Sequence, residues 1–192
     1  MTRNEWSTGT WTHEPASVSA DPDGLLVTCV EGSDAWRHTS YGFVHESEHA
    51  LVAPLEPGSA VEVVFLADFS QQFDQAGVYL CWDSEHWIKA GCEFADGRLQ
   101  VGAVVTDGHS DWSVRPVDWL GQRVRVRASW SDGAVTIRAG LDGEALELVR
   151  VAPFDAQAPV SAGPFTCAPT RAGLTTRFTS WEVLPADVSL HP

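Results

Sequence analysis

The chain has 192 residues, of which 44% are hydrophobic and 20% are charged. This composition is typical of a globular protein with a substantial core, and it excludes a chain that is disordered throughout. The 12 lysines and arginines are outnumbered by 26 aspartates and glutamates, so the formal net charge is -14. Such a field repels phosphate backbones and anionic lipids, which argues against nucleic acid and membranes as partners. We interpret the acidity as a contribution to solubility rather than as a sign of cationic substrates.

The N-terminal segment MTRNEWSTGTWTHEP lacks the apolar core of a signal peptide, and no later run reaches the length of a membrane span. We therefore expect a cytoplasmic protein. Its four cysteines, Cys29, Cys81, Cys92 and Cys167, show no CxxC spacing, and in that compartment we expect reduced, buried thiols. The sequence contains no phosphate-binding loop, nucleophile elbow or dinucleotide fingerprint, so it predicts no cofactor.

Short apolar runs bounded by Gly, Pro, Asp and Ser recur along the chain, and no apolar repeat of helical period lasts more than two turns. The pattern predicts an all-β protein, and a dozen short strands favour a two-sheet antiparallel β-sandwich over a small barrel. We expect a single domain over residues 1–192, because no linker or repeat interrupts the pattern. The predicted strands are Gly24–Val30, Trp36–Phe43, His49–Pro54, Ala60–Ala67, Ala76–Trp82, Trp87–Phe94, Arg98–Thr106, Arg123–Trp130, Ala134–Leu141, Ala145–Val151, Ser161–Thr166 and Leu174–Leu184.

Asp-Gly pairs separate several of these runs and suit two-residue hairpin turns, because both residue types tolerate positive φ. The four pairs are Asp23-Gly24, Asp96-Gly97, Asp132-Gly133 and Asp142-Gly143. A two-residue turn at Asp96-Gly97 fixes the register of its hairpin and predicts one wholly apolar face. That face pairs Phe94 with Leu99, Cys92 with Val101, Ala90 with Ala103 and Ile88 with Val105.

The opposite face of this hairpin carries polar residues and two adjacent glycines. It pairs Glu93 with Gln100, Gly91 with Gly102, Lys89 with Val104 and Trp87 with Thr106. The bare backbone at the glycines suits the floor of a ligand site, or else it accommodates curvature of the sheet or a neighbouring loop. The register of the preceding strand stays open, and with it whether Tyr79 or Leu80 shares this face.

The segments WIKAGCEF and VVTDGHSDWSV resemble a bacterial and fungal family, domain of unknown function 1349, which is named after a regulator of enolase. The resemblance extends to SDAWRHTSYGFVHESEHALVA, DQAG, LVRVAPF, VSAGPFTCAP and RFTSWEV, and so spans nearly the whole chain. It implies a concanavalin A-like jelly roll of the lectin/glucanase superfamily with one concave sheet. The family has no established catalytic residues to transfer. Its recurring polar positions match Arg37, Tyr41, His49, Trp87, Lys89, Glu93, Thr106, Ser110, Asp111 and Trp112.

The hairpin face and the family positions together define a candidate ligand site. Its tryptophans are expected to stack on sugar rings: Trp87 from the open face, and Trp112 from a turn beside Ser110 and Asp111. Asp111 alternatively caps that turn through backbone amides. The full candidate set is Trp87, Lys89, Glu93, Gln100, Thr106, Asp111, Trp112, Arg37, Tyr41 and His49.

Hydrolysis by a carboxylate pair is disfavoured, because the positions two and four residues before Glu93 are Gly91 and Lys89. Pairing of Glu93 with Asp68 or Asp111 from another strand stays open. His45 and His49 have the spacing of helical metal ligands, but on a strand they lie roughly 13 Å apart, so no metal site is predicted. His49 either joins a polar cluster with Arg37 and Tyr41 or is a hydrogen-bonded structural histidine.

Three functions fit these observations. The first is binding of a small carbohydrate-like or polyhydroxylated ligand on the concave sheet, without strong catalysis. The second is an enzyme acting on a sugar derivative, with Glu93 as acid or base and Lys89 tuning its ionisation or holding an anionic group. The third is a protein-interaction or metabolic-regulatory role, with an unknown protein partner.

Overall fold

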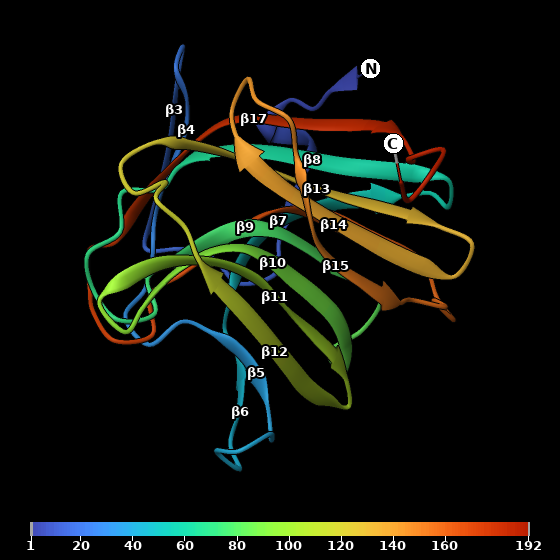
Figure 1. The fold of residues 1–192 in the computed structure, drawn as a ribbon. Helices are drawn as coiled ribbons and strands as arrows, with labels where there is room; N and C mark the ends of the chain where they lie inside the picture. The colour runs from blue at the N-terminus through green and yellow to red at the C-terminus, as the bar shows by residue number, and fades with distance from the viewer. Residues whose placement is uncertain (1, 192) are drawn as a thin grey trace.

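The computed structural model describes residues 2–191 and consists of two antiparallel sheets stacked face to face, with a short hairpin outside them (Figure 1). Within the described residues, the regular structure is β apart from one turn of 3-10 helix at Trp6–Thr8. This confirms the predicted two-sheet β-sandwich. No helix in this range is long and apolar enough to cross a membrane.

Sheet A forms one layer of the sandwich, and β1 (Thr2–Arg3) pairs with its strand β17. In spatial order its other strands are β15 (Glu147–Pro153), β14 (Ala134–Leu141), β13 (Arg123–Ser131), β8 (Ser59–Leu66), β17 (Thr175–Pro185), β4 (Gly24–Thr28) and β3 (Ser17–Asp21).

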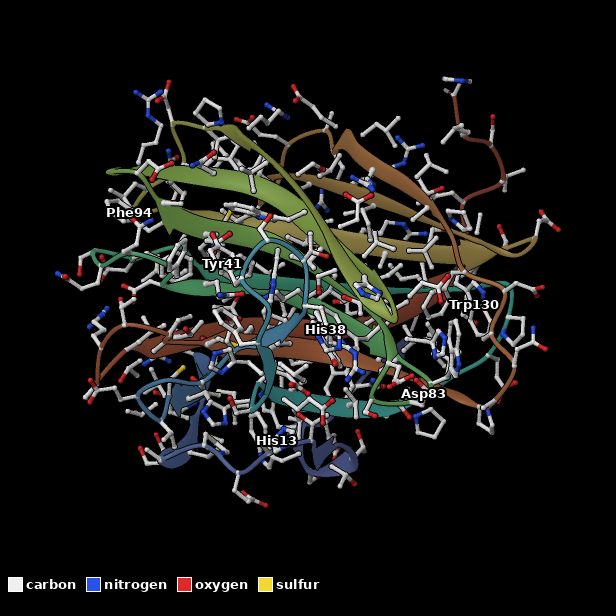
Figure 2. All side chains as sticks on the ribbon, turned by 90° about the horizontal axis from the view of Figure 1, so that it is seen from below. His13, His38, Tyr41, Asp83, Phe94 and Trp130 are labelled. Carbon is white, nitrogen blue, oxygen red and sulfur yellow. The ribbon has the colours of Figure 1, made fainter. Side chains whose placement is uncertain are left out.

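Sheet B forms the second layer and carries the Asp96-Gly97 hairpin near one edge. In spatial order its strands are β12 (His109–Pro116), β11 (Arg98–Asp107), β10 (His86–Ala95), β9 (Gln75–Cys81), β16 (Val160–Cys167), β7 (His49–Leu55) and β2 (Thr10–Trp11). The separate hairpin of β5 (Ala35–Arg37) and β6 (Val44–Glu46) lies against the face of sheet B that points away from sheet A (Figures 1 and 2).

Most predicted strands match these elements to within a few residues, but two regions differ. The predicted strand Trp36–Phe43 is wrong beyond Arg37, because His38, Ser40 and Gly42 all adopt positive φ and turn the chain into the β5–β6 loop. The turn predicted around Trp112 is instead edge strand β12. Its mostly polar, exposed sequence lacks the apolar alternation by which strands are recognised.

The turn predictions are confirmed at two of the four Asp-Gly pairs. Asp96-Gly97 and Asp132-Gly133 close two-residue hairpins with positive φ at both residues, as a type I′ turn requires. At Asp23-Gly24 the prediction is wrong, because Gly24 pairs with Asp21 and the turn residues are Pro22 and Asp23. Asp142-Gly143 begins a longer connection between β14 and β15.

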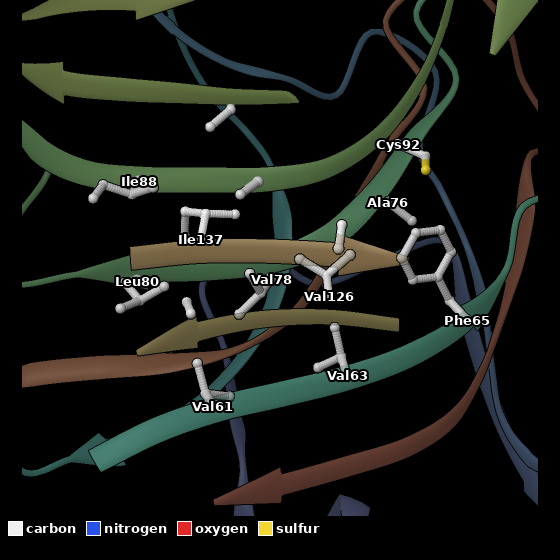
Figure 3. Close-up of a cluster of buried hydrophobic side chains, with 14 of the residues drawn as sticks. Val61, Val63, Phe65, Ala76, Val78, Leu80, Ile88, Cys92, Val126 and Ile137 are labelled. Atoms are coloured by element: carbon white, nitrogen blue, oxygen red, sulfur yellow. The ribbon is translucent and has the colours of Figure 1, made fainter. Parts of the chain in front are cut away.

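The register counted from Asp96-Gly97 is confirmed at every pair, from Ala95 with Arg98 to Trp87 with Thr106. The structure also settles the register of β9: Lys89 pairs with Tyr79 and Ile88 with Leu80, so Tyr79 shares the polar face. The apolar face packs against sheet A, where Ile88, Leu80 and Val78 meet Val126 and Ile137 in one core (Figure 3). All four cysteines are free.

A row of glycines lets sheet B bend. Gly91 is paired with Gly77 on one side and Gly102 on the other. A Cβ atom on Gly91 would lie 2.1 Å from the carbonyl oxygen of Ala76, and one on Gly102 would lie 2.0 Å from that of Ser113. These approaches are far closer than any side chain tolerates, so the glycines permit the strands to come together at the bend. The close approach of neighbouring backbone accounts for glycine at Gly91 and Gly102, and their role as the floor of a ligand site stays a prediction.

Replacing Gly91 by alanine tests this role. We expect the free energy of unfolding to fall by at least about 2 kcal/mol, because the added methyl group meets backbone that cannot rotate away. Gly97→Ala is the matched control: φ there is +77° but the space is open, so we expect a loss of about 1 kcal/mol from backbone strain alone. Urea unfolding measures both losses. Equal losses would show that close packing at the bend does not require Gly91.

Candidate functional site

The β5–β6 hairpin is fastened to sheet B through Arg37, whose side chain is buried. Its guanidinium donates to Glu46 and Glu85, both at 2.6 Å, and to the carbonyl of Gly108 at 3.3 Å. Its backbone N–H donates to the hydroxyl of Ser110 at 2.9 Å. Three separate chain segments therefore meet at one side chain, and the start of the hairpin is fixed over the end of sheet B.

The loop of this hairpin lies across the open face of sheet B, with Tyr41 near its tip (Figure 2). It is closed by backbone hydrogen bonds from His38 to Phe43 at 2.8 Å and from Gly42 to His38 at 2.7 Å. The indole N–H of Trp36 donates to the carbonyl of Thr39 at 3.1 Å, which ties the loop to the strand before it. The loop therefore holds its aromatic residues above the sheet.

Between the hairpin and sheet B lies a cavity of about 350 Å³. This volume falls in the range of small-molecule sites. Aromatic rings supply much of its wall, and polar side chains of β10 and of the segment before β5 supply the rest. The lining residues are Gly32, Asp34, Trp36, Tyr41, Phe43, His45, Phe73, Lys89, Glu93, Val104, Trp112, Pro169 and Thr170.

Lys89 and Asp34 form a buried ion pair in this cavity. The ammonium of Lys89, which is only 6% exposed, donates to Oδ1 of Asp34 at 2.6 Å. The same oxygen accepts from the amide of Gln75 at 3.3 Å. Burial alone would lower the pKa of Lys89, but the negative charge of Asp34 outweighs it and raises this pKa above its usual value. Lys89 is therefore charged and held in place.

Glu93 lies in the same cavity but forms no ion pair with any of the described residues 2–191. Burial raises the pKa of its carboxyl to about 7, while Lys89 and a hydrogen bond from Trp112 partly oppose this shift. The carboxyl group consequently titrates near neutral pH. A carboxyl of this kind can either donate or accept a hydrogen bond under physiological conditions.

Four of the aromatic rings that line the cavity contact one another in different orientations. Trp36 contacts Tyr41 and Trp112 edge-on, with centroids 5.6 Å and 6.4 Å away, and Tyr41 stacks on Phe43 at 5.2 Å. Tyr41 is 58% exposed and Trp112 is 37% exposed. Both residues line the cavity, so part of each ring surface is accessible to a small molecule there.

The structure brings together only part of the predicted site. Lys89, Glu93, Tyr41 and Trp112 line the cavity. Trp87 does not: its indole is 2% exposed and stacks on Tyr79 in a second apolar cluster beneath the hairpin. The prediction that Trp87 faces a ligand is wrong in this respect, because the hairpin covers the indole.

The remaining predicted residues support the surrounding structure. Gln100 donates to the carbonyl of Ala95, and Thr106 is hydrogen-bonded to Ser110, which holds Arg37. Asp111 pairs with Arg150 at 2.7 Å, a contact that differs from the predicted turn cap.

His49 is hydrogen-bonded to the backbone rather than to Arg37 or Tyr41, which agrees with its predicted alternative role as a structural histidine. Its Nε2 accepts from the backbone N–H of Val30 at 3.1 Å, and its Nδ1 lies 3.0 Å from the carbonyl of His13. Burial lowers its pKa, so the ring is neutral.

Sequence reasoning missed Asp34, Trp36, Phe43 and His45. All four belong to the hairpin or the residues just before it, within a segment that the family resemblance covers. Nothing local indicates that Asp34 meets Lys89, because the two residues are 55 positions apart in the chain. Among the described residues, no group of three or more His, Cys, Asp or Glu side chains could hold a metal ion.

Comparison with known proteins identifies the family. Residues 11–186 match the family described as "Protein of unknown function (DUF1349)". The chain belongs to this family. It is 35% identical to "Regulation of enolase protein 1" of Saccharomyces cerevisiae over 190 residues, which cover 97% of this chain and 95% of the yeast protein. A crystal structure of a functionally unknown protein from Saccharomyces cerevisiae matches with a TM-score of 0.90 at 32% identity, covering 97% of this chain and 100% of that one.

Two more distant structures share the fold of this DUF1349 protein. A GH43 protein from Bacillus licheniformis, BlXynB, matches with a TM-score of 0.73 at 11% identity, over 96% of this chain and 38% of that one. A legume lectin-like domain from Entamoeba histolytica matches with a TM-score of 0.63 at 9% identity, over 95% and 92%. At such identities the likeness establishes the jelly-roll fold alone.

The raised pKa of Glu93 predicts a pH dependence of stability that Glu93→Gln removes. The folded-state pKa is about 7 against 4.5 for a free carboxyl, so the stabilising contribution of the protonated group is complete below about pH 4.5 and is lost as the pH rises through 7. We expect a loss on the order of 2 kcal/mol across this interval, after allowance for solvent screening of a half-buried group.

Urea unfolding of the wild type and Glu93→Gln at a series of pH values measures this loss. Burial also raises the pKa of Glu48 and of Glu62, so the difference between the two proteins is the informative quantity. Glu56→Gln, at an exposed position, serves as the control. The quantity compared is the free energy of unfolding of the wild type minus that of Glu93→Gln. If this difference does not change with pH, the raised pKa of Glu93 is contradicted.

Proposed function

We propose that this protein binds a small carbohydrate-like or polyhydroxylated ligand in the cavity between the β5–β6 hairpin and sheet B. The observation that carries the proposal is the combination of accessible aromatic faces with charged groups held at fixed positions in one small cavity. Trp112 and Tyr41 present apolar ring faces, on which the C–H faces of a sugar can stack. Asp34, Lys89 and Glu93 present donors and acceptors for hydroxyl groups.

The polar groups are fixed before a ligand arrives. Lys89 has three N–H donors, of which one is satisfied by Asp34 in the described part of the chain. The Asp34 carboxylate is also held by Gln75, which donates to the same oxygen as Lys89. Little conformational entropy is therefore lost when hydroxyl groups bind to these atoms. The lectin-like and GH43 structural neighbours are compatible with this proposal because they share the jelly-roll fold.

A glycan array followed by calorimetry with the best ligand tests the proposal. We expect Trp112→Ala to weaken binding by about tenfold, because the stacking surface is lost. Val44→Ala is the matched control: Val44 is exposed on the same hairpin and lies outside the cavity lining. Circular dichroism verifies that both variants are folded. Absence of binding across the array, or unchanged affinity in Trp112→Ala, would refute the proposed site.

A second candidate function is acid–base catalysis on a bound sugar derivative. The observation that favours it is the Glu93 carboxyl with a pKa of about 7, in a cavity that also holds the Lys89–Asp34 pair. A group that titrates near the working pH is suited to proton transfer to or from a reacting oxygen. Asp34 is the second carboxylate of the cavity, whereas Asp68 and Asp111, the predicted partners of Glu93, lie outside its lining.

If this second function holds, Glu93→Gln should lower kcat by a factor of about 100 or more while leaving KM within a few-fold, because the amide fills the same space but cannot transfer a proton. The assay follows turnover of sugar derivatives that are first shown to bind. Glu56→Gln, outside the cavity, controls for the loss of a surface charge. Bound ligands that the wild type leaves unchanged, or turnover that survives in Glu93→Gln, would eliminate catalysis by Glu93.

A further inference from the structure

The charges in the cavity do not balance. Its lining contains two carboxyl groups, Asp34 and Glu93, one lysine, Lys89, and one histidine, His45. Lys89 is neutralised by Asp34 at 2.6 Å. Lys89 is also the only lysine of the chain, since all other basic residues apart from histidine are arginines. When Glu93 is ionised, it therefore carries a negative charge that no described residue balances by an ion pair.

The position of Glu93 makes this imbalance relevant to a ligand. Its neighbours on the flanking strands are the neutral residues Gln75 and Gln100, and the nearby charge of Asp96 adds to its negative surroundings. Lys89 lies four residues away on the same strand, at most roughly 13 Å along it. Among the described residues, Glu93 thus forms no ion pair, and the Lys89 charge that acts on it is already paired with Asp34.

The rings that line the cavity with Glu93 suit a cation. Trp112 stands nearly perpendicular to Trp36, with an interplanar angle of 86°. Tyr41 and Phe43 lie parallel to each other within 9° and contribute a further ring plane. Aromatic faces in several orientations around a carboxylate attract alkylammonium groups through cation–π contacts. A purely apolar ligand would leave Glu93 buried without a partner, at a cost in affinity.

We propose that the cavity recognises a ligand bearing an ammonium group, with Glu93 as its counter-charge and the rings of Tyr41, Phe43 and Trp112 as its cage. The ligand class is an amino sugar or an amino polyol, whose hydroxyl groups bind at the Lys89–Asp34 pair. This inference rests on the proposed function, because it assigns the ligand of the same cavity. The support for it is the position of Glu93 among the aromatic rings of the cavity, and it does not depend on the net negative charge of the whole chain.

Two pairs of probes separate charge from shape. Choline is compared with its uncharged isostere 3,3-dimethyl-1-butanol, and glucamine with sorbitol, by calorimetry or NMR titration at about pH 8. At this pH Glu93 is ionised and a primary amine remains protonated. We expect each cation to bind at least about tenfold more tightly than its neutral partner. Glu93→Gln should reduce this preference to less than about threefold.

The control variant is Asp96→Asn, which removes a carboxylate from the neighbouring turn without altering the cavity lining. Asparagine tolerates the positive φ of that position, so this variant should keep the preference for cations. Phe43→Leu should weaken choline more than 3,3-dimethyl-1-butanol, because only the cation gains from the ring face.

The outcomes distinguish this inference from the proposed function. If sorbitol or neutral glycans bind as tightly as glucamine, recognition of an ammonium group is overturned while the proposed function stands. If choline shows the preference but no polyol or glycan binds, recognition of an ammonium group is supported and the polyhydroxylated ligand is overturned. If none of the probes or glycans binds, both are overturned. A preference for cations that persists in Glu93→Gln would overturn the role of Glu93.

Discussion

The arrangement of the candidate site depends on the ion pair between Lys89 and Asp34. A lysine in the middle of strand β10, almost fully buried, cannot keep its charge without an opposite charge close by. Asp34 meets this requirement, and it is the residue directly before β5. The pair therefore determines where the hairpin leaves the sandwich. Such pairs add little net stability, but losing one partner leaves an uncompensated buried charge, so their main effect is to fix a unique geometry.

Arg37 completes the attachment that Asp34 begins. The two residues are three positions apart. Asp34 connects the hairpin to Lys89 of β10. Arg37 connects it to Glu85, just before β10, and to Gly108, just after β11. With its base fixed at both points, the loop from His38 to Phe43 has little freedom to swing away from sheet B. Sheet B is curved beneath this loop (Figure 1), and its row of glycines permits the close approach of neighbouring strands. The cavity thus results from a curved floor and a fastened cover.

The fold was largely predictable from sequence because its signals are local. Alternating apolar residues and the Asp96-Gly97 turn specify the β10–β11 hairpin, and a two-residue turn leaves a single register. Counting along that hairpin predicted the site only at Lys89 and Glu93, and the family resemblance added Tyr41 and Trp112. Its other half comes from the β5–β6 segment, whose contact with sheet B depends on long-range ion pairs that no local pattern reveals. The same contact buries Trp87. The sequence placed this residue on the correct face of the sheet, but it could not show that the hairpin covers that part of the face.

The lysine at position 89 also affects which ligand groups the cavity can bind. All other basic residues of the chain, apart from histidine, are arginines. Arg37, Arg127 and Arg171 each use several N–H groups to bind more than one acceptor atom. Lysine is a compact point charge that can satisfy a single oxygen of Asp34 and retain donors for other partners. An arginine fork at this place would direct its donors into one fixed plane. The lysine retains hydrogen-bonding capacity, which a structural ion pair alone does not require.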